Sequence, residues 1–344
     1  MAQRAALRLL DCAPAGTFAS FTFLRSIDRM GRGIPLFVLD TNMQLLNTLV
    51  AHAIPWIPRS LVQKISRRYI AGDDLAQAVM RIRQLNAQGF SVTVDVLGET
   101  ASTTQQAENT VHEYKQVLEA IHDHGLDATI SVKPTALGLL LDRQECGQRL
   151  AHIVESAAQH KTAVCIDMED VRCTQMEIDL FSQIKARYSN VSLALQAYLR
   201  RTYQDIGPLL CHGNSLRLCK GIYLEDRSHL VDEAWRDRGA INPHFLAHIT
   251  RCFDTGTFVG VATHDAAFVE EVIALARSSR IDPKQFEFQM LLGVCESLRD
   301  RLLEMGFKVR IYVPYGKDWY GYSTRRMKEN PRIVGHVARA LISF

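Results

Sequence analysis

Short apolar segments rich in β-branched residues alternate along the chain with longer segments of helical periodicity. We predict a strand in each of eight apolar runs: residues 90–97, 128–133, 162–168, 191–196, 215–220, 257–263, 285–291 and 307–313. Between them, apolar residues recur every three to four positions, which predicts helices at 103–122, 146–159, 176–188, 243–251, 266–278 and 296–305. Strands that alternate with helices in this way favour a parallel sheet.

Eight strand–helix units in a row predict an α/β fold of the (β/α)8 TIM-barrel type. The alternative is an open, doubly wound sheet, which usually has a glycine-rich turn after its first strand. Here the first predicted strand is followed by Gly98, Glu99 and Thr100, and no G-x-G-x-x-G motif occurs. We therefore favour the closed barrel.

The chain divides into an arm and a barrel. We predict an N-terminal helical arm over residues 1–72, and a barrel domain with a C-terminal helix over residues 73–344. Asp73 is placed to cap the helix predicted at 75–88. Residues 331–344 gather apolar side chains on one helical face, for which two placements are open: packed on the barrel or lying on a membrane surface.

Composition narrows the class of protein. The chain is 47% hydrophobic and 22% charged with a net charge of +3, and its basic residues are spread out, which argues against nucleic acid as a partner. Its eight cysteines include no C-x-x-C pair, so we expect reduced thiols. The N-terminus lacks the continuous apolar core of a signal peptide, and polar residues interrupt the apolar stretch 34–57. We expect a cytoplasmic protein.

Polar side chains recur where the predicted strands end, which is where barrel enzymes carry their catalytic groups. They are Lys133, Asp167, Glu169, Asp170, Gln196, Arg217, Lys220, Thr263, His264, Asp265, Gln289, Tyr312 and Tyr315. Any one of them could make a purely structural hydrogen bond, but their recurrence on strand after strand predicts an active site. His122 and His124 precede a strand instead of ending one, so we expect no metal site.

Strand alternation assigns two of these side chains to the barrel interior. Leu216 and Leu218 face one side of their strand and Arg217 the other, and the same alternation turns Gln196 inward. A buried arginine needs an acceptor. This pair of side chains suits a polar heterocycle that carries negative charge in one of its states.

The last predicted helix carries a second candidate group. After a turn at 314–316 we predict a helix over 317–330, ended by Pro331. Four of its residues share one face: Tyr322, Arg325, Arg326 and Glu329. Two adjacent arginines hold a small carboxylate well, and Glu329 is placed to pair with Arg325. A solvated charged face is the alternative reading.

The strand-end motifs resemble those of the proline dehydrogenase family, over residues 68–331. The matching motifs are SVK (131–133), IDMED (166–170), LQAYL (195–199), RLCKG (217–221), ATHD (262–265), FEFQ (286–289), YVPYG (312–316) and YSTRRMKENP (322–331). The family includes stand-alone bacterial enzymes and the barrel domain of bifunctional proline utilisation enzymes. The resemblance implies an FAD-dependent oxidation of L-proline to 1-pyrroline-5-carboxylate, the first step of proline catabolism.

The resemblance also implies roles for individual residues. The FAD site would comprise Met168, Gln196, Arg217, Lys220, Gly221, Ile222, Thr263, His264 and Gln289. The substrate site would comprise Lys133, Asp167, Leu291, Tyr312, Tyr322, Arg325, Arg326 and Glu329. Asp167 and Arg217 would be catalytic, in a reaction that moves a hydride from proline C5 to flavin N5. Electrons would then pass to a membrane quinone. The oligomeric state is left open.

Two positions depart from the family pattern. Ile222 stands where the family usually has alanine, and Leu292 where it usually has histidine or tyrosine. Both put substrate preference and rate in question. Two other functions remain as alternatives: a Schiff-base lyase that uses Lys133 as its nucleophile, and an amino-acid sensor that binds without turnover.

Overall fold

Eight parallel strands form a closed barrel in chain order, which confirms the predicted (β/α)8 fold. The computed structural model describes residues 62–63, 66–98 and 100–329. The strands are β1 (Ser91–Val96), β2 (Ala128–Val132), β3 (Val164–Ile166), β4 (Val191–Gln196), β5 (Ser215–Cys219), β6 (Phe258–Ala262), β7 (Phe286–Leu291) and β8 (Val309–Tyr315). Each lies within or close to the apolar run that predicted it.

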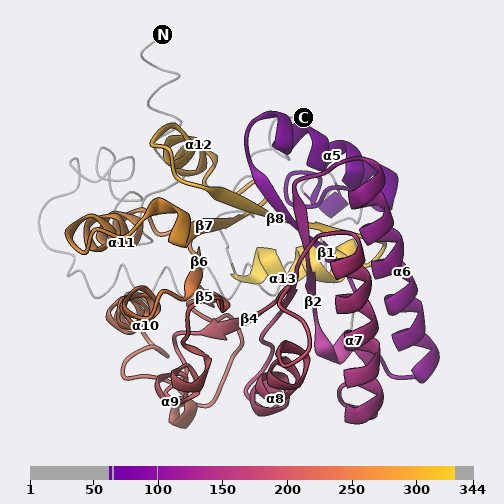
Figure 1. The fold of residues 1–344 in the computed structure, drawn as a ribbon, viewed down its shortest axis with the longest axis horizontal. Helices are drawn as coiled ribbons and strands as arrows, with labels where there is room; N and C mark the ends of the chain where they lie inside the picture. The colour runs from indigo at the N-terminus through magenta and orange to yellow at the C-terminus, as the bar shows by residue number, and fades with distance from the viewer. Residues whose placement is uncertain (1–61, 64–65, 99, 330–344) are drawn as a thin grey trace, which may run out of the picture.

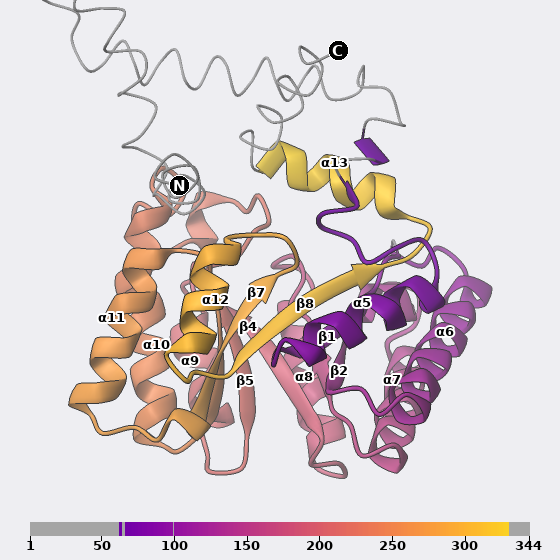
Figure 2. The ribbon, with the colours of Figure 1, turned by 90° about the horizontal axis from the view of Figure 1, so that it is seen from above.

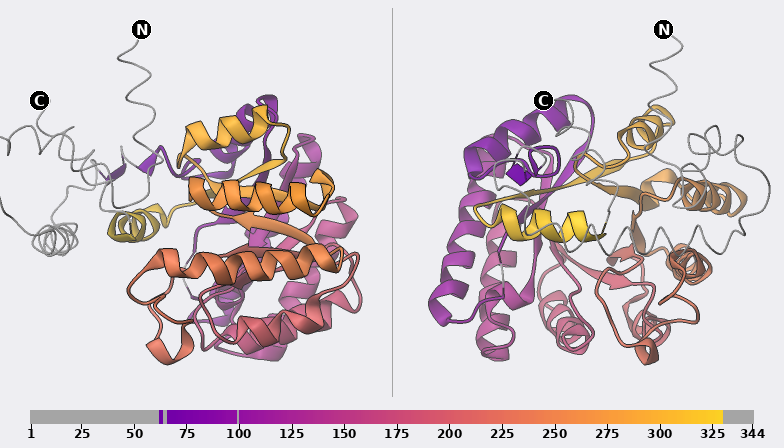
Figure 3. Two further views of the ribbon diagram at one scale, coloured as in Figure 1. Left: turned by 90° about the vertical axis from the view of Figure 1, so that its left-hand side faces the viewer. Right: turned by 180° about the vertical axis from the view of Figure 1, so that it is seen from behind.

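Helices surround the barrel, as Figure 1 shows. They are α5 (Leu75–Ala87), α6 (Thr104–Asp123), α7 (Arg143–Gln159), α8 (Thr174–Lys185), α9 (Thr202–Asp205), α10 (Asn242–Asp254), α11 (Ala266–Ser278) and α12 (Glu296–Glu304). A further helix, α13 (Trp319–Glu329), follows β8. Figures 2 and 3 show α13, in yellow, lying across one end of the barrel. Because α13 follows the last strand, this is the end at which the strands finish.

Side-chain caps set where several helices begin. Thr103 accepts a hydrogen bond from the backbone N–H of Gln106 at the start of α6. At the start of α5 the cap is Asp74, which accepts from the backbone N–H of Gln77 at 2.9 Å. The predicted cap, Asp73, is therefore wrong by one residue. Two acidic residues stand side by side here, and only the backbone geometry decides which of them is the cap.

The end of β8 also differs from the prediction. A turn was expected at 314–316, but β8 continues through Pro314 to Tyr315, and α13 begins at Trp319. The carbonyl of Pro314 accepts from the backbone N–H of Ala71, outside the barrel ladder. The pairing of β8 with β7 ends at Tyr312, so Pro314 lies beyond that ladder, where a strand can include proline.

Two predicted segments fall wholly or mainly outside the described residues. They are the N-terminal arm at 1–72, of which 62–63 and 66–72 are described, and the C-terminal helix at 331–344. The domain boundary proposed at residue 72 therefore stays a prediction.

The barrel interior contains an unusual number of polar groups. In β1, Ser91, Thr93 and Asp95 alternate with valines, and all six residues of the strand are buried. The hydroxyls of Thr93 and Thr129 lie 3.1 Å apart, and Nη1 of Arg310 donates to the carbonyl of Val92 at 2.8 Å. Branched aliphatic layers usually fill such barrels. Here hydrogen bonds hold much of the interior, and they continue upward into the candidate site.

Candidate active site

Asp167 is the centre of a polar cluster at the carboxyl end of the barrel. It follows β3 directly and accepts hydrogen bonds from three other strands. Nη1 of Arg217 and Oγ of Ser131 both reach its Oδ1 at 2.5 Å, and the hydroxyl of Tyr312 reaches Oδ2 at 2.9 Å. Nζ of Lys133 lies 4.0 Å from Oδ2. The structure thus brings together four predicted site residues that are distant in sequence, along with Ser131.

Lys133 is held by a second carboxylate. Its ammonium group donates a hydrogen bond to Asp95, whose side chain is 1% exposed. Burial alone would lower the pKa of Lys133, but Asp95 and Asp167 together raise it above its usual value. Lys133 therefore stays cationic. Asp95 was not predicted from the sequence, although its alternation with valines, shared with Ser91 and Thr93, indicates an inward-facing side chain near the end of β1.

Arg217 lies at the middle of the cluster, with its side chain 9% exposed. Its Nε donates to Oε1 of Gln289 at 2.7 Å, and its Nη1 also reaches Oγ of Ser131 at 3.0 Å. The guanidinium carbon lies 5.4 Å from the centre of the Tyr312 ring. Arg217, which strand alternation placed in the barrel interior, is therefore in the barrel mouth and in contact with Gln289, another of the predicted site residues.

A buried ion pair lies beneath these residues. Glu287 accepts from Nε2 of Gln289 at 2.9 Å and from Nε of Arg310 at 2.5 Å. Glu287 is 2% exposed and Arg310 is 8% exposed. Burial by itself would raise the pKa of Glu287, but Arg310 holds it below its usual value. Neither residue was predicted from the sequence, because each lies near the start of its strand, two positions before Gln289 and Tyr312, whereas the predicted residues lie towards the carboxyl ends.

Gln196 ends β4 with its side chain buried, as predicted. Its Nε2 donates to the carbonyls of Met168 and Glu169, both at 3.1 Å. These two bonds determine which atom of the amide is the donor. Its Oε1 is buried, and no group among the described residues donates to it. A buried acceptor left open in this way is suited to a group that carries an N–H or O–H.

The loop after β3 is held by two buried glutamates. Glu169 accepts from the backbone N–H of Thr135 at 2.9 Å and from its hydroxyl at 2.6 Å. Glu177, in the first turn of α8, accepts in turn from the backbone N–H of Glu169 at 3.1 Å. Burial and the neighbouring Glu169 raise the pKa of Glu177 to about 9. These contacts position the Met168 and Glu169 carbonyls that bind Gln196.

The ends of β5 and β6 form the next part of the rim. Lys220 donates to Asp265 at 3.0 Å, and Asp265 also caps α11. Gly221 has φ of +102°, and a Cβ there would lie 2.2 Å from Cδ1 of Tyr198. This position therefore requires glycine. The next residue, Ile222, is 38% exposed.

His264 and Leu291 connect β6 to β7. The backbone N–H of Leu291 donates to Nε2 of His264 at 2.9 Å, so that nitrogen is unprotonated. Thr263 is buried beside them, and its backbone N–H donates to the carbonyl of Gln289 at 3.2 Å. These residues form a continuous wall along the mouth.

The predicted residues of α13 are described only in part. Tyr322 is buried and packs in a small cluster with Ile70 and Leu97, beside the polar site. The side chains of Arg325, Arg326 and Glu329 lie outside the described part of the structure. Asp170 lies apart from the cluster, because it pairs with the exposed Arg172 at 2.7 Å.

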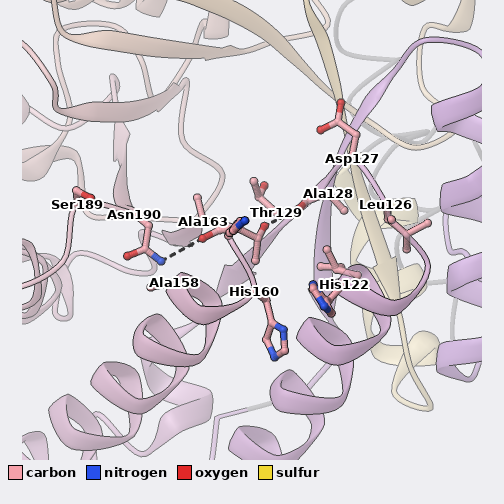
Figure 4. Close-up of a pocket in the computed structure, with 14 residues that line it drawn as sticks. His122, Leu126, Asp127, Ala128, Thr129, Ala158, His160, Ala163, Ser189 and Asn190 are labelled. Carbon is pink, nitrogen blue, oxygen red and sulfur yellow. Dashed lines mark hydrogen bonds between the residues drawn. The ribbon is translucent and has the colours of Figure 1, made fainter.

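A separate hollow of about 640 Å³ lies at the opposite, amino-terminal end of β2 and β3. Figure 4 shows His122, Asp127, His160 and Asn190 around it.

Among residues 62–63, 66–98 and 100–329, no group of three or more potential metal ligands lies close enough to hold an ion. No helix in these ranges is long and apolar enough to cross a membrane.

Fold and site together define a (β/α)8-barrel protein with a charged, hydrogen-bonded cluster at the carboxyl ends of its strands. A sequence profile described as proline dehydrogenase matches residues 78–339. Proline dehydrogenase 2 of Bacillus subtilis is 38% identical over 275 residues, which cover 80% of this chain and 89% of the relative. Proline dehydrogenase of Deinococcus radiodurans is 27% identical and covers 83% and 93%. The chain belongs to the proline dehydrogenase family.

Solved structures support the fold. Proline utilization A from Bdellovibrio bacteriovorus, inactivated by N-propargylglycine, superposes with a TM-score of 0.72 at 18% identity. The match covers 84% of this chain and 37% of that one. The corresponding Bradyrhizobium japonicum protein has a TM-score of 0.64 at 22% identity. This chain thus spans about a third of those longer chains.

Proposed function

We propose that this protein oxidises L-proline to 1-pyrroline-5-carboxylate with FAD as cofactor, and that the electrons pass on to a quinone. The main support is the fixed arrangement of Arg217 against Asp167, Gln289 and Tyr312 in a chain of this family. A cation held by three strands beside a buried open acceptor suits a redox cofactor with a flat polar ring.

The residues present fit a flavin. A flavin ring has an imide N–H, which would donate to the open Oε1 of Gln196. Its carbonyl oxygens would accept hydrogen bonds from N–H donors such as those of Arg217 and Lys220. Gly221 lacks the Cβ that would strike Tyr198, so the backbone after β5 packs directly against that ring at the rim of the site. We assign the FAD site to Met168, Gln196, Arg217, Lys220, Gly221, Ile222, Thr263, His264 and Gln289. When bound, FAD supplies the hydride acceptor at N5.

The chain's own charges suit proline as substrate. Lys133 and Arg217 are cationic but are paired with Asp95 and Asp167, so the cluster is close to neutral. Burial in a pocket without net negative charge favours loss of the proton from the proline amine. A neutral amine has the lone pair that drives hydride loss from the ring carbon. We assign substrate contacts to Lys133, Asp167, Leu291, Tyr312 and Tyr322. From the sequence we add Arg325 and Arg326 as a carboxylate clamp, supported by Glu329.

The Schiff-base alternative requires Lys133 to lose its proton near neutral pH. Asp95 and Asp167 raise the pKa of Lys133, which is the opposite of what a lysine nucleophile needs. Borohydride treatment with a keto acid present should therefore leave Lys133 unmodified. A covalent adduct on Lys133 in a protein without flavin would favour the lyase.

The direct test is a visible absorption spectrum of the purified protein before and after anaerobic addition of L-proline. A flavin spectrum that bleaches with proline would support cofactor and substrate together. A flavin spectrum unchanged by proline would refute the substrate. A protein that stays colourless after reconstitution with FAD would refute the cofactor.

A further inference from the structure

Glu287, Gln289 and Arg217 form a hydrogen-bonded line from the barrel interior to its mouth. We propose that Glu287 is a positioning residue for the reaction: it fixes the orientation of the Gln289 amide, which in turn fixes Arg217. This inference rests on the proposed function, because Arg217 is the cation assigned there to the flavin. Glu287 itself is beneath the site and acts only through Gln289.

The side-chain amide of Gln289 is hydrogen-bonded to two partners, one that only accepts hydrogen bonds and one that only donates them. A carboxylate accepts hydrogen bonds only, so Glu287 requires Nε2 of Gln289 on its side, at 2.9 Å. A guanidinium donates only, so Nε of Arg217 requires Oε1 on the other side, at 2.7 Å. One amide orientation satisfies both partners, and the reverse orientation satisfies neither.

Glu287 can perform this role because its charge is itself fixed. Nε and Nη2 of Arg310 donate to its two oxygens at 2.5 and 3.1 Å, and Lys308 lies 3.4 Å away. Arg310 also donates to the Val92 carbonyl in β1, which fixes its own position. These cations keep Glu287 ionised at 2% exposure, so it always presents acceptors to Gln289.

The bonds to Arg217 determine which of its nitrogens remains available. Nε is used by Gln289, and Nη1 by Asp167 and Ser131. Among the described residues no group accepts from Nη2, which leaves this nitrogen for a ligand. If Gln289 turned over, its NH2 group would face Nε of Arg217, and the guanidinium would have to rotate away.

Space for this arrangement depends on Gly260 in β6. A Cβ at residue 260 would lie 2.2 Å from Nε2 of Gln289. Gly260 pairs in register with Arg217 on one side and Glu287 on the other. An alanine here would displace the Gln289 amide without changing any charge, and it would meet the end of a flexible side chain, not backbone.

The experiment compares the wild-type flavoprotein with three variants. Glu287→Gln removes the acceptor-only partner but leaves Arg310 buried without its anion, which endangers folding. Gly260→Ala disturbs the same amide with all charges intact. Glu108→Gln is the control: it removes the carboxylate that binds the buried Arg149 on α7 at 2.6 Å, outside the barrel interior. Three readouts apply: melting temperature, proline kinetics, and solvent exchange of the Arg217 Nε–H followed by NMR, assigned with Arg217→Lys.

We expect Gly260→Ala, and Glu287→Gln where it folds, to lower kcat for proline about tenfold while KM changes less than about twofold. The Arg217 Nε–H should exchange faster in both, whereas Glu108→Gln should lower only the melting temperature. Wild-type exchange and wild-type kcat in Gly260→Ala would overturn the proposal. A wild-type protein that proline fails to reduce would refute the proposed function instead, and the exchange comparison would still decide the positioning role.

Discussion

The hydroxyl of Tyr312 on β8 donates to Oδ2 of Asp167 after β3 at 2.9 Å. This bond spans the barrel mouth and fixes the plane of the Tyr312 ring beside Arg217. Because Asp167 is also held by Arg217 and Ser131, the ring is a rigid edge of the site. A small cyclic substrate that binds here must fit the space that this edge leaves.

Tyr312→Ser should raise activity on 4-hydroxyproline relative to proline, because removing the ring leaves room for an added hydroxyl. The measurement is the ratio of kcat/KM for the two substrates. Tyr312→Phe keeps the ring and loses only the bond to Asp167, so it should preserve the wild-type ratio. An unchanged ratio in Tyr312→Ser would mean that the ring does not touch the substrate.

Arg326→Met should raise KM for proline by an amount equivalent to about 2–3 kcal/mol, the usual cost of losing a charge-assisted hydrogen bond. The prediction comes from the sequence, where Arg325 and Arg326 stand together on the last helix. Lys328→Met removes one positive charge from the same helix and should leave KM near wild type. If KM is equal in both variants, the carboxylate clamp is not at Arg326.

Gly221→Ala should lower stability by at least about 1–3 kcal/mol and weaken FAD retention, since φ is +102° and the new methyl would strike Tyr198. Chemical denaturation and the flavin content of purified protein test the two effects. Gly98→Ala is a suitable control, because a Cβ at Gly98 meets no atom within 4 Å. Equal behaviour of the two variants would argue against a constrained backbone at residue 221.

His248 should make the folded state sensitive to acid. It is fully buried beside Tyr203, with ring centres 4.5 Å apart, and neither ring nitrogen has a partner among the described residues. Burial, with Arg251 and His244 nearby, lowers its pKa from 6.5 to about 4. Between these values the unfolded chain binds a proton that the folded chain does not, so stability falls as pH drops from 6.5 towards 4.

His248→Leu should remove this dependence. Its stability relative to wild type, measured by denaturant unfolding, should increase steadily as pH is lowered from 7 to about 4. His112→Gln replaces an exposed histidine on α6 and should follow wild type at each pH. A constant difference between His248→Leu and wild type would show that His248 titrates alike in both states.

Strand positions could be predicted because each interior strand is a short apolar run between polar helical segments. The catalytic candidates after the strands, such as Asp167, were predictable for the same reason. Asp95, Glu287 and Arg310 were harder, since a charged residue inside a strand looks unfavourable until its partner on another strand is known. Asp95 pairs with Lys133 on the next strand unit and Glu287 with Arg310 on the next strand, and only the pairing and register of these strands bring the partners together.

The assignments to α13 mark another limit. Helical spacing places Tyr322, Arg325 and Arg326 on one face, but spacing does not say what that face meets. Tyr322 packs with Ile70 and Leu97, and Ile70 comes from the segment before the barrel. Such a contact depends on how two ends of the chain meet, which no local pattern contains.

The junction of β1 and β8 has a consequence for synthesis of the chain. Arg310 bonds to the carbonyl of Val92 across 218 positions of sequence, so the barrel cannot close until nearly all of the chain has left the ribosome. Until then the edge of β1 that pairs with β8 has no partner, and Glu287 has not yet paired with Arg310. Long-range parallel pairing of this kind is slow, and the partly folded intermediates with unpaired strand edges are prone to aggregation. Newly made chains should therefore depend on chaperones most strongly in the interval before the eighth strand emerges.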